Sequence, residues 1–189
     1  MHIRDLTYAE FGSVITEIDL GNLSVEEWER IYSLWNDRAL LIFPKAFLTK
    51  DNQDTFAKRF GALEFPRTAI SNVGKGGKIH HESGDDVVKV IRGNEGWHHD
   101  STYMPVQAKG AVFTAEIIPA EGGLTGWADM RAAYDALDND LRDTLSELSA
   151  YHSYYYSQGR DGYLPSSQND DGTYNAYGFH NGEASLRPL

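Results

Sequence analysis

The sequence predicts a single domain in which short β-strands are flanked by α-helices. The length of 189 residues is enough for one domain with a sizeable core. Hydrophobic residues make up 41% of the chain and charged residues 24%, which excludes a chain that is disordered throughout. Segments with alternating apolar residues, typical of strands, are interspersed with segments whose apolar residues recur at helical spacing.

The first two elements illustrate both patterns. Residues 14–20 alternate well enough to predict an early strand. Ser24 and Glu27 have the spacing of a capping box, in which each side chain accepts a hydrogen bond from the other residue's backbone N–H. Apolar residues recur at helical spacing after them, so we expect a helix over about 25–37.

The same criteria predict the remaining elements. Apolar or β-branched runs predict strands over residues 39–43, 87–91 and 110–118. Periodic apolar residues predict helices over about 51–60, after a capping Asp129, and around 141–148. Glycine-rich and polar composition predicts loops over 66–86 and 157–182.

Charge and composition exclude several functional classes. The chain has 17 Lys and Arg against 28 Asp and Glu, a net charge of −11, which argues against general nucleic-acid binding. Cysteine is absent, which excludes disulfides, thiolate metal sites and cysteine nucleophiles. No apolar run is long enough to cross a membrane or to form a signal peptide, so we expect a cytoplasmic protein without membrane partners. Any metal would be bound by His, Asp, Glu or backbone oxygen.

The most informative pair of residues is His98 and Asp100. In an extended segment, residues two apart project to the same side, so one imidazole nitrogen and one carboxylate oxygen can bind a single cation, while His99 points away. One more His would complete the ligand triad of non-heme Fe(II) oxygenases. The spacing is also common by chance, and the alternative is a loop in which Asp100 turns the backbone.

Four blocks of sequence around this pair carry a family resemblance. Residues Trp97-His98-His99-Asp100-Ser101-Thr102 are similar to the Trp-His-x-Asp-x-(Ser/Thr) signature of the TauD/TfdA family of Fe(II)- and 2-oxoglutarate-dependent dioxygenases. The other three blocks that resemble the family are Leu40–Thr49, Gln53–Glu64 and Ala120–Tyr134. All four occur in the family's order, and the resemblance extends over residues 14 to about 150.

The resemblance implies a fold and an activity. The implied fold is mainly β with flanking α-helices, a double-stranded β-helix (jelly-roll) with the metal in the mouth of the barrel. The implied enzyme is an oxidoreductase that uses Fe(II), 2-oxoglutarate and O2. It would hydroxylate a small organic substrate while 2-oxoglutarate is converted to succinate and CO2.

The resemblance also implies roles for individual residues. His98 and Asp100 match the first two iron ligands and are the implied catalytic residues. Thr125 matches the threonine whose hydroxyl donates a hydrogen bond to a carboxylate of 2-oxoglutarate. Asn94 matches a position that often faces the substrate. His80 and His81 lie in the loop that approaches the substrate in the family, and His81 is taken as the one that faces the pocket. His152 matches a histidine that starts a lid loop. The residues that follow His152 could form a lid that closes over the substrate, or an ordinary loop that packs its tyrosines on the core.

Two features of the family have no match, namely its third iron ligand, a distal His, and the Arg that pairs with 2-oxoglutarate. We therefore expect residues 1–189 to form one domain that lacks the C-terminal strands of the jelly-roll. The alternative is a truncated, non-catalytic jelly-roll that serves as a binding module. A metal-dependent hydrolase is a further alternative, but it would need a third ligand and a general base for which no motif is present. The oligomeric state is left open, a homo-oligomer included.

Overall fold

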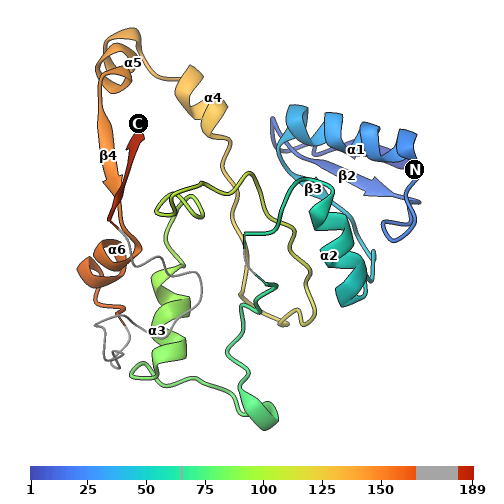
Figure 1. Cartoon of the computed structure of the whole chain (residues 1–189), viewed down its shortest axis with the longest axis horizontal. Helices are drawn as coiled ribbons and strands as arrows, with labels where there is room; N and C mark the ends of the chain where they lie inside the picture. The colour runs from blue at the N-terminus through green and yellow to red at the C-terminus, as the bar shows by residue number, and fades with distance from the viewer. Residues whose placement is uncertain (65, 165–182) are drawn as a thin grey trace. The chain divides into compact units, whose positions relative to one another are not determined.

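The computed structural model describes residues 1–64, 66–164 and 183–189 (Figure 1). The chain forms two compact units, each made of two separate stretches of sequence. The first unit comprises Met1–Leu63 and Gly110–Arg142. The second comprises Glu64–Lys109 and Asp143–Leu189.

A small sheet forms the start of the first unit. Its strands are β1 (His2–Asp5), β2 (Ser13–Thr16) and β3 (Leu41–Ile42). β2 lies in the centre, antiparallel to β1 and parallel to β3. The strands predicted over 14–20 and 39–43 are therefore present as β2 and β3, each over fewer residues than expected.

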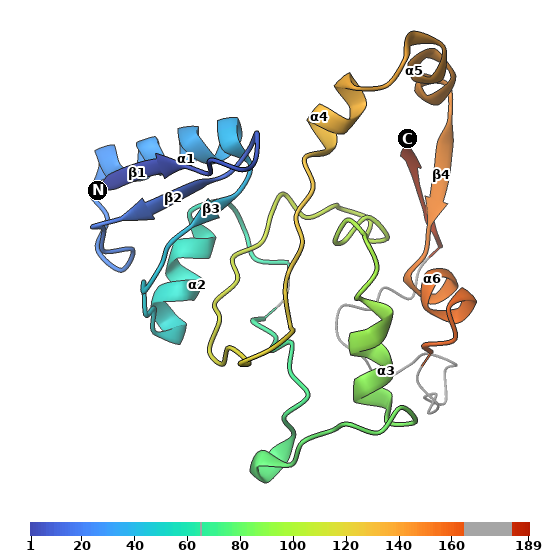
Figure 2. The ribbon, with the colours of Figure 1, turned by 180° about the vertical axis from the view of Figure 1, so that it is seen from behind.

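Two helices, α1 (Val25–Arg38) and α2 (Lys50–Lys58), lie beside this sheet (Figure 2). The predicted capping box at the start of α1 is confirmed, with Ser24 and Glu27 each bound to the other's backbone N–H. The Thr49 hydroxyl caps α2 by accepting from the N–H of Asn52 at 3.2 Å.

The core of the first unit is aliphatic at its centre and aromatic at its edge. The buried cluster consists of Ile15, Leu20, Leu23, Ile31 and Phe56. Beside it, the ring of Phe60 packs edge-on against those of Trp28 and Trp35, with centroids 4.9 and 5.0 Å apart. These aromatic side chains belong to the packing of the helices, because edge-to-face contacts at this distance are a favoured aromatic geometry.

The remainder of the first unit includes α4 (Met130–Asp135), which Asp129 caps as predicted. Arg131 extends from α4 to the end of α1, where its guanidinium donates to the carbonyl oxygens of Asn36 and Asp37. Since the last carbonyls of a helix have no partner within it, this contact stabilises the end of α1. The next helix, α5 (Asn139–Ser146), is also confirmed.

The strand predicted over 110–118 is wrong, since these residues have no regular secondary structure. A strand needs a neighbouring strand for its backbone hydrogen bonds, and among the described residues none pairs with this segment. A side chain supplies one of the missing bonds, because Gln53 Nε2 donates to the carbonyl oxygen of Val112 at 3.1 Å.

The second unit contains α3 (Asp86–Gly93), β4 (Ser149–His152), α6 (Tyr154–Arg160) and β5 (Ser185–Pro188). β4 and β5 pair antiparallel, and a short 3-10 turn spans Lys75–Gly77. The loop predicted over 157–182 begins instead as the last turn of α6, and residues 165–182 lie outside the described residues.

The strand predicted over 87–91 is also wrong, because these residues form the body of α3. The β-branched run favours a strand, but the penalty for such residues in a helix is only a few tenths of a kcal/mol each. The Asp85 side chain caps the helix by accepting from the N–H of Val87 at 2.9 Å, and Val88 and Val90 become buried. Capping and burial together outweigh the local preference.

The observed architecture is mixed, with small sheets and several helices, rather than mainly β. More of the described residues lie in helices than in strands, and the segments 87–91 and 110–118, predicted as strands, are helical and irregular. None of the helices in the described ranges combines the length and apolar character needed to span a bilayer.

The packing of α1 leads to a stability prediction. Ile31 is fully buried, so Ile31→Ala should lower the free energy of unfolding by about 2–5 kcal/mol through lost burial and the cavity left behind. The control is Val25→Ala in the same helix, where the side chain is 67% exposed, and which should change stability by no more than about 0.5 kcal/mol. Urea unfolding followed by far-UV circular dichroism measures both. Equal effects of the two substitutions would contradict this description of the core.

Candidate metal centre

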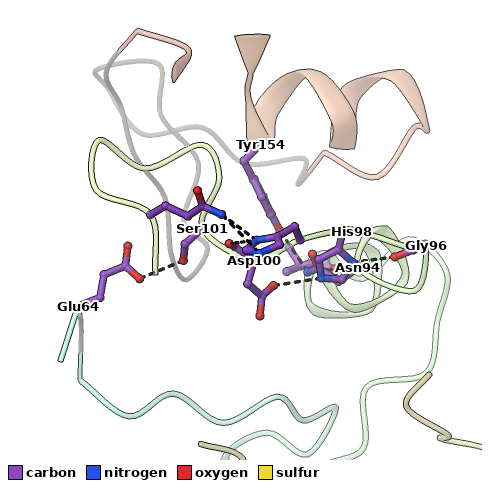
Figure 3. Close-up of polar contacts among 10 residues, drawn as sticks. Glu64, Asn94, Gly96, His98, Asp100, Ser101 and Tyr154 are labelled. Carbon is purple, nitrogen blue, oxygen red and sulfur yellow. Dashed lines mark hydrogen bonds and ion pairs between the residues drawn. The ribbon is translucent and has the colours of Figure 1, made fainter. Parts of the chain in front are cut away.

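His98 and Asp100 face each other in the second unit, in the segment that follows α3 (Figure 3). Nε2 of His98 lies 3.1 Å from Oδ1 of Asp100. The other ring nitrogen, Nδ1, lies 2.7 Å from the carbonyl oxygen of Gly96. Because a carbonyl oxygen can only accept a hydrogen bond, Nδ1 carries a hydrogen and Nε2 is the nitrogen available to a metal.

The distance between these two atoms fits a shared cation. With metal–ligand distances of about 2.1 Å and a right angle at the metal, neighbouring ligand atoms lie about 3.0 Å apart. A neutral imidazole nitrogen and a carboxylate oxygen both present lone pairs, so they face each other stably only with a proton or a cation between them. The side chains are 47% and 61% exposed, so small molecules can reach the pair.

The backbone that carries the pair is irregular. His98 and His99 belong to no helix or strand, a turn begins at Asp100, and Ser101, directly after it, has a left-handed backbone with φ of 58°. The N–H of Met104 donates to the carbonyl oxygen of Ser101 at 3.0 Å, so the chain reverses immediately after the carboxylate. A left-handed backbone at a residue other than glycine costs about 1–2 kcal/mol, so other contacts must hold this turn.

One such contact comes from Glu64. The buried Ser101 hydroxyl donates to Oε2 of Glu64 at 3.0 Å (Figure 3). Both residues lie in blocks that carry the family resemblance, but the sequence did not predict their contact, since nothing in the spacing connects positions 37 residues apart. His99 has different contacts from His98, with its ring beside the Gln107 side-chain amide and the carbonyl oxygen of Asp100.

Comparison with known proteins places this signature in a family. The family model described as "Taurine catabolism dioxygenase TauD, TfdA family" matches residues 2–185. The chain belongs to the TauD/TfdA family. The resemblance found in the sequence is therefore confirmed over almost the whole chain.

Individual TauD/TfdA relatives support the assignment. The chain is 52% identical over 182 residues to the (S)-phenoxypropionate/alpha-ketoglutarate-dioxygenase of Sphingobium herbicidovorans, covering 96% of this chain and 63% of the relative. It is 46% identical over 190 residues to the enzyme of that name from Delftia acidovorans, covering 97% of this chain and 64% of that relative. A crystal structure of AAD-2 in complex with Mn(II) and N-oxalylglycine has a TM-score of 0.81 and 32% identity, covering 90% of this chain and 62% of that one. The chain thus spans less than two thirds of the length of these relatives.

A third TauD/TfdA metal ligand is not found among the residues that the structure describes. Within residues 1–64, 66–164 and 183–189, no three His, Cys, Asp or Glu side chains are grouped closely enough to bind a metal ion. His98 and Asp100 are therefore two ligands, and other positions on a metal bound there would be open to further ligands.

Two of the predicted substrate-facing residues lie close to the metal segment. Asn94 ends α3, and its Nδ2 donates to the carbonyl oxygen of Val90 at 2.9 Å and to the Tyr154 hydroxyl at 3.3 Å. Burial raises the pKa of the Tyr154 phenol above its usual value. His152 lies in β4, and its Nδ1 is 2.8 Å from Oγ1 of Thr102, the last residue of the signature.

The other two predicted residues belong to other segments of the chain. Thr125 is exposed and belongs to the first unit, whereas His98 and Asp100 belong to the second. His81 is exposed and lines a shallow hollow with Lys78, Ile79, His80, Glu82 and Asp85. The roles implied for Asn94, His81, His152 and Thr125 stay predictions.

The hollow beside His81 contains a short ion pair. Nδ1 of His80 lies 2.5 Å from Oδ2 of Asp85, the residue that caps α3. This hydrogen bond is the largest cause that lowers the pKa of the Asp85 carboxyl below its usual range, against an opposing effect of burial. The loop that carries His81 is thereby attached to the start of α3.

The lowered pKa of Asp85 predicts a pH dependence. A carboxyl whose pKa is lower in the folded than in the unfolded state contributes stability at neutral pH. That contribution begins to be lost as the pH falls below about 4, the pKa of the carboxyl in the unfolded chain. The loss is complete once the pH is below the lower pKa of the folded state. Asp85→Asn should therefore make the acid limb of the stability curve less steep than in the wild type.

Urea unfolding between pH 2 and 6 measures this effect, and Glu95→Gln, at an exposed carboxylate after α3, is the control. An unchanged acid limb in Asp85→Asn would show that the His80 contact does not stabilise the folded chain.

Proposed function

We propose that this protein is an Fe(II)- and 2-oxoglutarate-dependent dioxygenase that hydroxylates a small organic substrate. The observation that carries the proposal is the pair of facing atoms, His98 Nε2 and Asp100 Oδ1, 3.1 Å apart within the TauD/TfdA signature. The relatives named as alpha-ketoglutarate dioxygenases and the AAD-2 complex with Mn(II) and N-oxalylglycine support the same cofactor and co-substrate.

The residues have distinct tasks in this proposal. His98 and Asp100 would bind Fe(II), which when bound would supply the activation of O2 and of 2-oxoglutarate. The Gly96 carbonyl orients the imidazole by accepting from Nδ1, as partners of metal-bound histidines commonly do. Thr125 would donate its hydroxyl hydrogen to a carboxylate of 2-oxoglutarate without adding charge. Asn94, His81 and His152 would contact the substrate.

The proposed substrate class is an aryloxyalkanoic acid. Its support is the relatives' names, (S)-phenoxypropionate and 2,4-dichlorophenoxyacetate dioxygenases, the latter 35% identical over 161 residues in Cupriavidus pinatubonensis. One oxygen atom of O2 would enter the C–H bond beside the ether oxygen and the other would enter succinate. The hydroxylated carbon then releases the phenol as its C–O bond breaks, leaving a 2-oxo acid.

The proposed fold of the domain is the double-stranded β-helix, with residues 1–189 as part of one such domain. The high TM-score to AAD-2 supports this architecture. The third metal ligand and the Arg for 2-oxoglutarate would come from outside the described residues. The proposed cellular location is the cytoplasm.

Metal binding provides the direct test of the site. The 189-residue chain should bind Mn²⁺ under anaerobic conditions, as measured by the loss of the free-ion EPR signal during titration. His98→Ala and Asp100→Ala should each weaken binding by more than about tenfold, because each removes a ligand atom. His99→Ala is the matched control and should bind as the wild type does.

Equal binding by His98→Ala and the wild type would show that the metal site lies elsewhere or does not exist. Mn²⁺ binding without succinate formation from 2-oxoglutarate in the presence of Fe(II) and air would favour the non-catalytic binding module.

The substrate class has its own prediction. Adding (S)-phenoxypropionate should increase succinate formation and release phenol in equal amount, because each hydroxylation consumes one 2-oxoglutarate. Chromatography of both products measures this ratio, and taurine, which lacks the ether, is the control. Succinate formation that does not respond to any aryloxyalkanoic acid would contradict the substrate proposal while leaving the metal site intact.

A further inference from the structure

The residues directly after the metal pair receive side-chain hydrogen bonds on their backbone carbonyl groups. Thr102–Pro105 form turns and bends outside any helix or strand. Backbone carbonyl groups that leave water need a hydrogen-bond donor, and here side chains must supply it. Those side chains, Ser185 and Arg187, belong to β5, while His152 of the neighbouring strand β4 lies beside the Thr102 hydroxyl.

These side chains share one face of the β4–β5 pair. In the register, His152 lies opposite Ser185, and Ala150 lies opposite Arg187. Paired residues share a face, and residues two apart along a strand share it too, so these four side chains project together. They are partly buried, while the alternate positions on both strands are exposed. The buried face is therefore largely polar, which suits a segment of irregular backbone.

Arg187 makes the most extensive contacts on this face. Its Nε donates to the carbonyl oxygen of Thr102 at 3.1 Å, and its Nη2 donates to that of Met104 at 2.5 Å. The Ser185 hydroxyl adds a donor within reach of the Tyr103 and Met104 carbonyls, at 3.1 and 3.2 Å. A guanidinium holds several donors in a rigid fork, so two carbonyls two residues apart are fixed relative to each other.

The turn that Arg187 holds is the one on which the metal pair depends. Ser101 has a left-handed φ of 58°, and it stands between Asp100 and the carbonyl of Thr102. Glu64 binds the Ser101 side chain on one side, and Arg187 binds the backbone on the other. Without either contact, the turn would relax toward an ordinary backbone and move the Asp100 carboxylate away from His98.

We propose that Arg187 is a positioning residue for the metal centre, acting through the Thr102–Pro105 backbone and not through contact with metal or substrate. This proposal rests on the function proposed above, because it presumes that His98 and Asp100 bind the metal. It gives β5 a role in the site that the signature itself does not reveal.

The test compares Arg187→Ala and Arg187→Lys with the wild type in the 189-residue chain. The control is Arg160→Ala in the same unit, where an exposed arginine pairs with the adjacent Asp161. Hydrogen–deuterium exchange of the Met104 amide reports on the turn, and Mn²⁺ titration by EPR reports on the metal pair. Far-UV circular dichroism confirms that each variant is folded.

We expect Arg187→Ala to accelerate exchange of the Met104 amide at least tenfold and to weaken Mn²⁺ binding by about tenfold, the usual scale for residues that orient ligands. Arg187→Lys should give exchange rates and Mn²⁺ affinities between those of the wild type and of Arg187→Ala. A single ammonium group cannot donate to both carbonyls in the fixed geometry of a guanidinium. Arg160→Ala should match the wild type in both measurements.

Three results would overturn the proposal. These are unchanged exchange in Arg187→Ala, altered exchange with unchanged Mn²⁺ binding, and a lysine variant that equals the wild type. A wild-type chain that binds no Mn²⁺, or binds it equally well with His98→Ala, would instead overturn the proposed function. The two failures are therefore distinguishable.

Discussion

The short distance between His98 Nε2 and Asp100 Oδ1 depends on a backbone segment that lies outside any helix or strand. Regular elements satisfy their own hydrogen bonds, but the segment that carries the pair is a turn whose polar groups need partners from elsewhere. Glu64 and Arg187 supply those partners for Ser101 and for the residues after it. The turn that follows the pair is thus held by hydrogen bonds from distant side chains.

The first unit is stabilised on a different principle. Ile15, Ile31 and Phe56 bring a strand and two helices onto one apolar cluster, and edge-to-face aromatic contacts extend it. Such a core tolerates irregular connections around it, because burial is not directional. The arrangement of polar donors in the second unit is directional, which is why a single left-handed residue matters there.

The sequence predicted the elements whose signals are local. The capping box of Ser24 and Glu27 and the cap at Asp129 depend on residues three or fewer apart, and both are present. The segments 87–91 and 110–118 were predicted from β-branched composition, which reports only a weak preference. One became a helix once Asp85 capped it, and the other has no partner strand among the described residues.

The candidate metal site likewise has features that the local sequence predicts and features that depend on distant contacts. The sequence by itself determined that His98 and Asp100 belong to a family signature, because that information lies within six residues, and the three further blocks in the same order indicated the family. Only the tertiary structure decided that the chain turns at Asp100 and which distant residues bind that turn. Glu64 and Arg187 are 37 and 85 positions from the residues they bind. No local pattern encodes such contacts, because the hydrogen bonds that define them form only when separate parts of the chain have folded together.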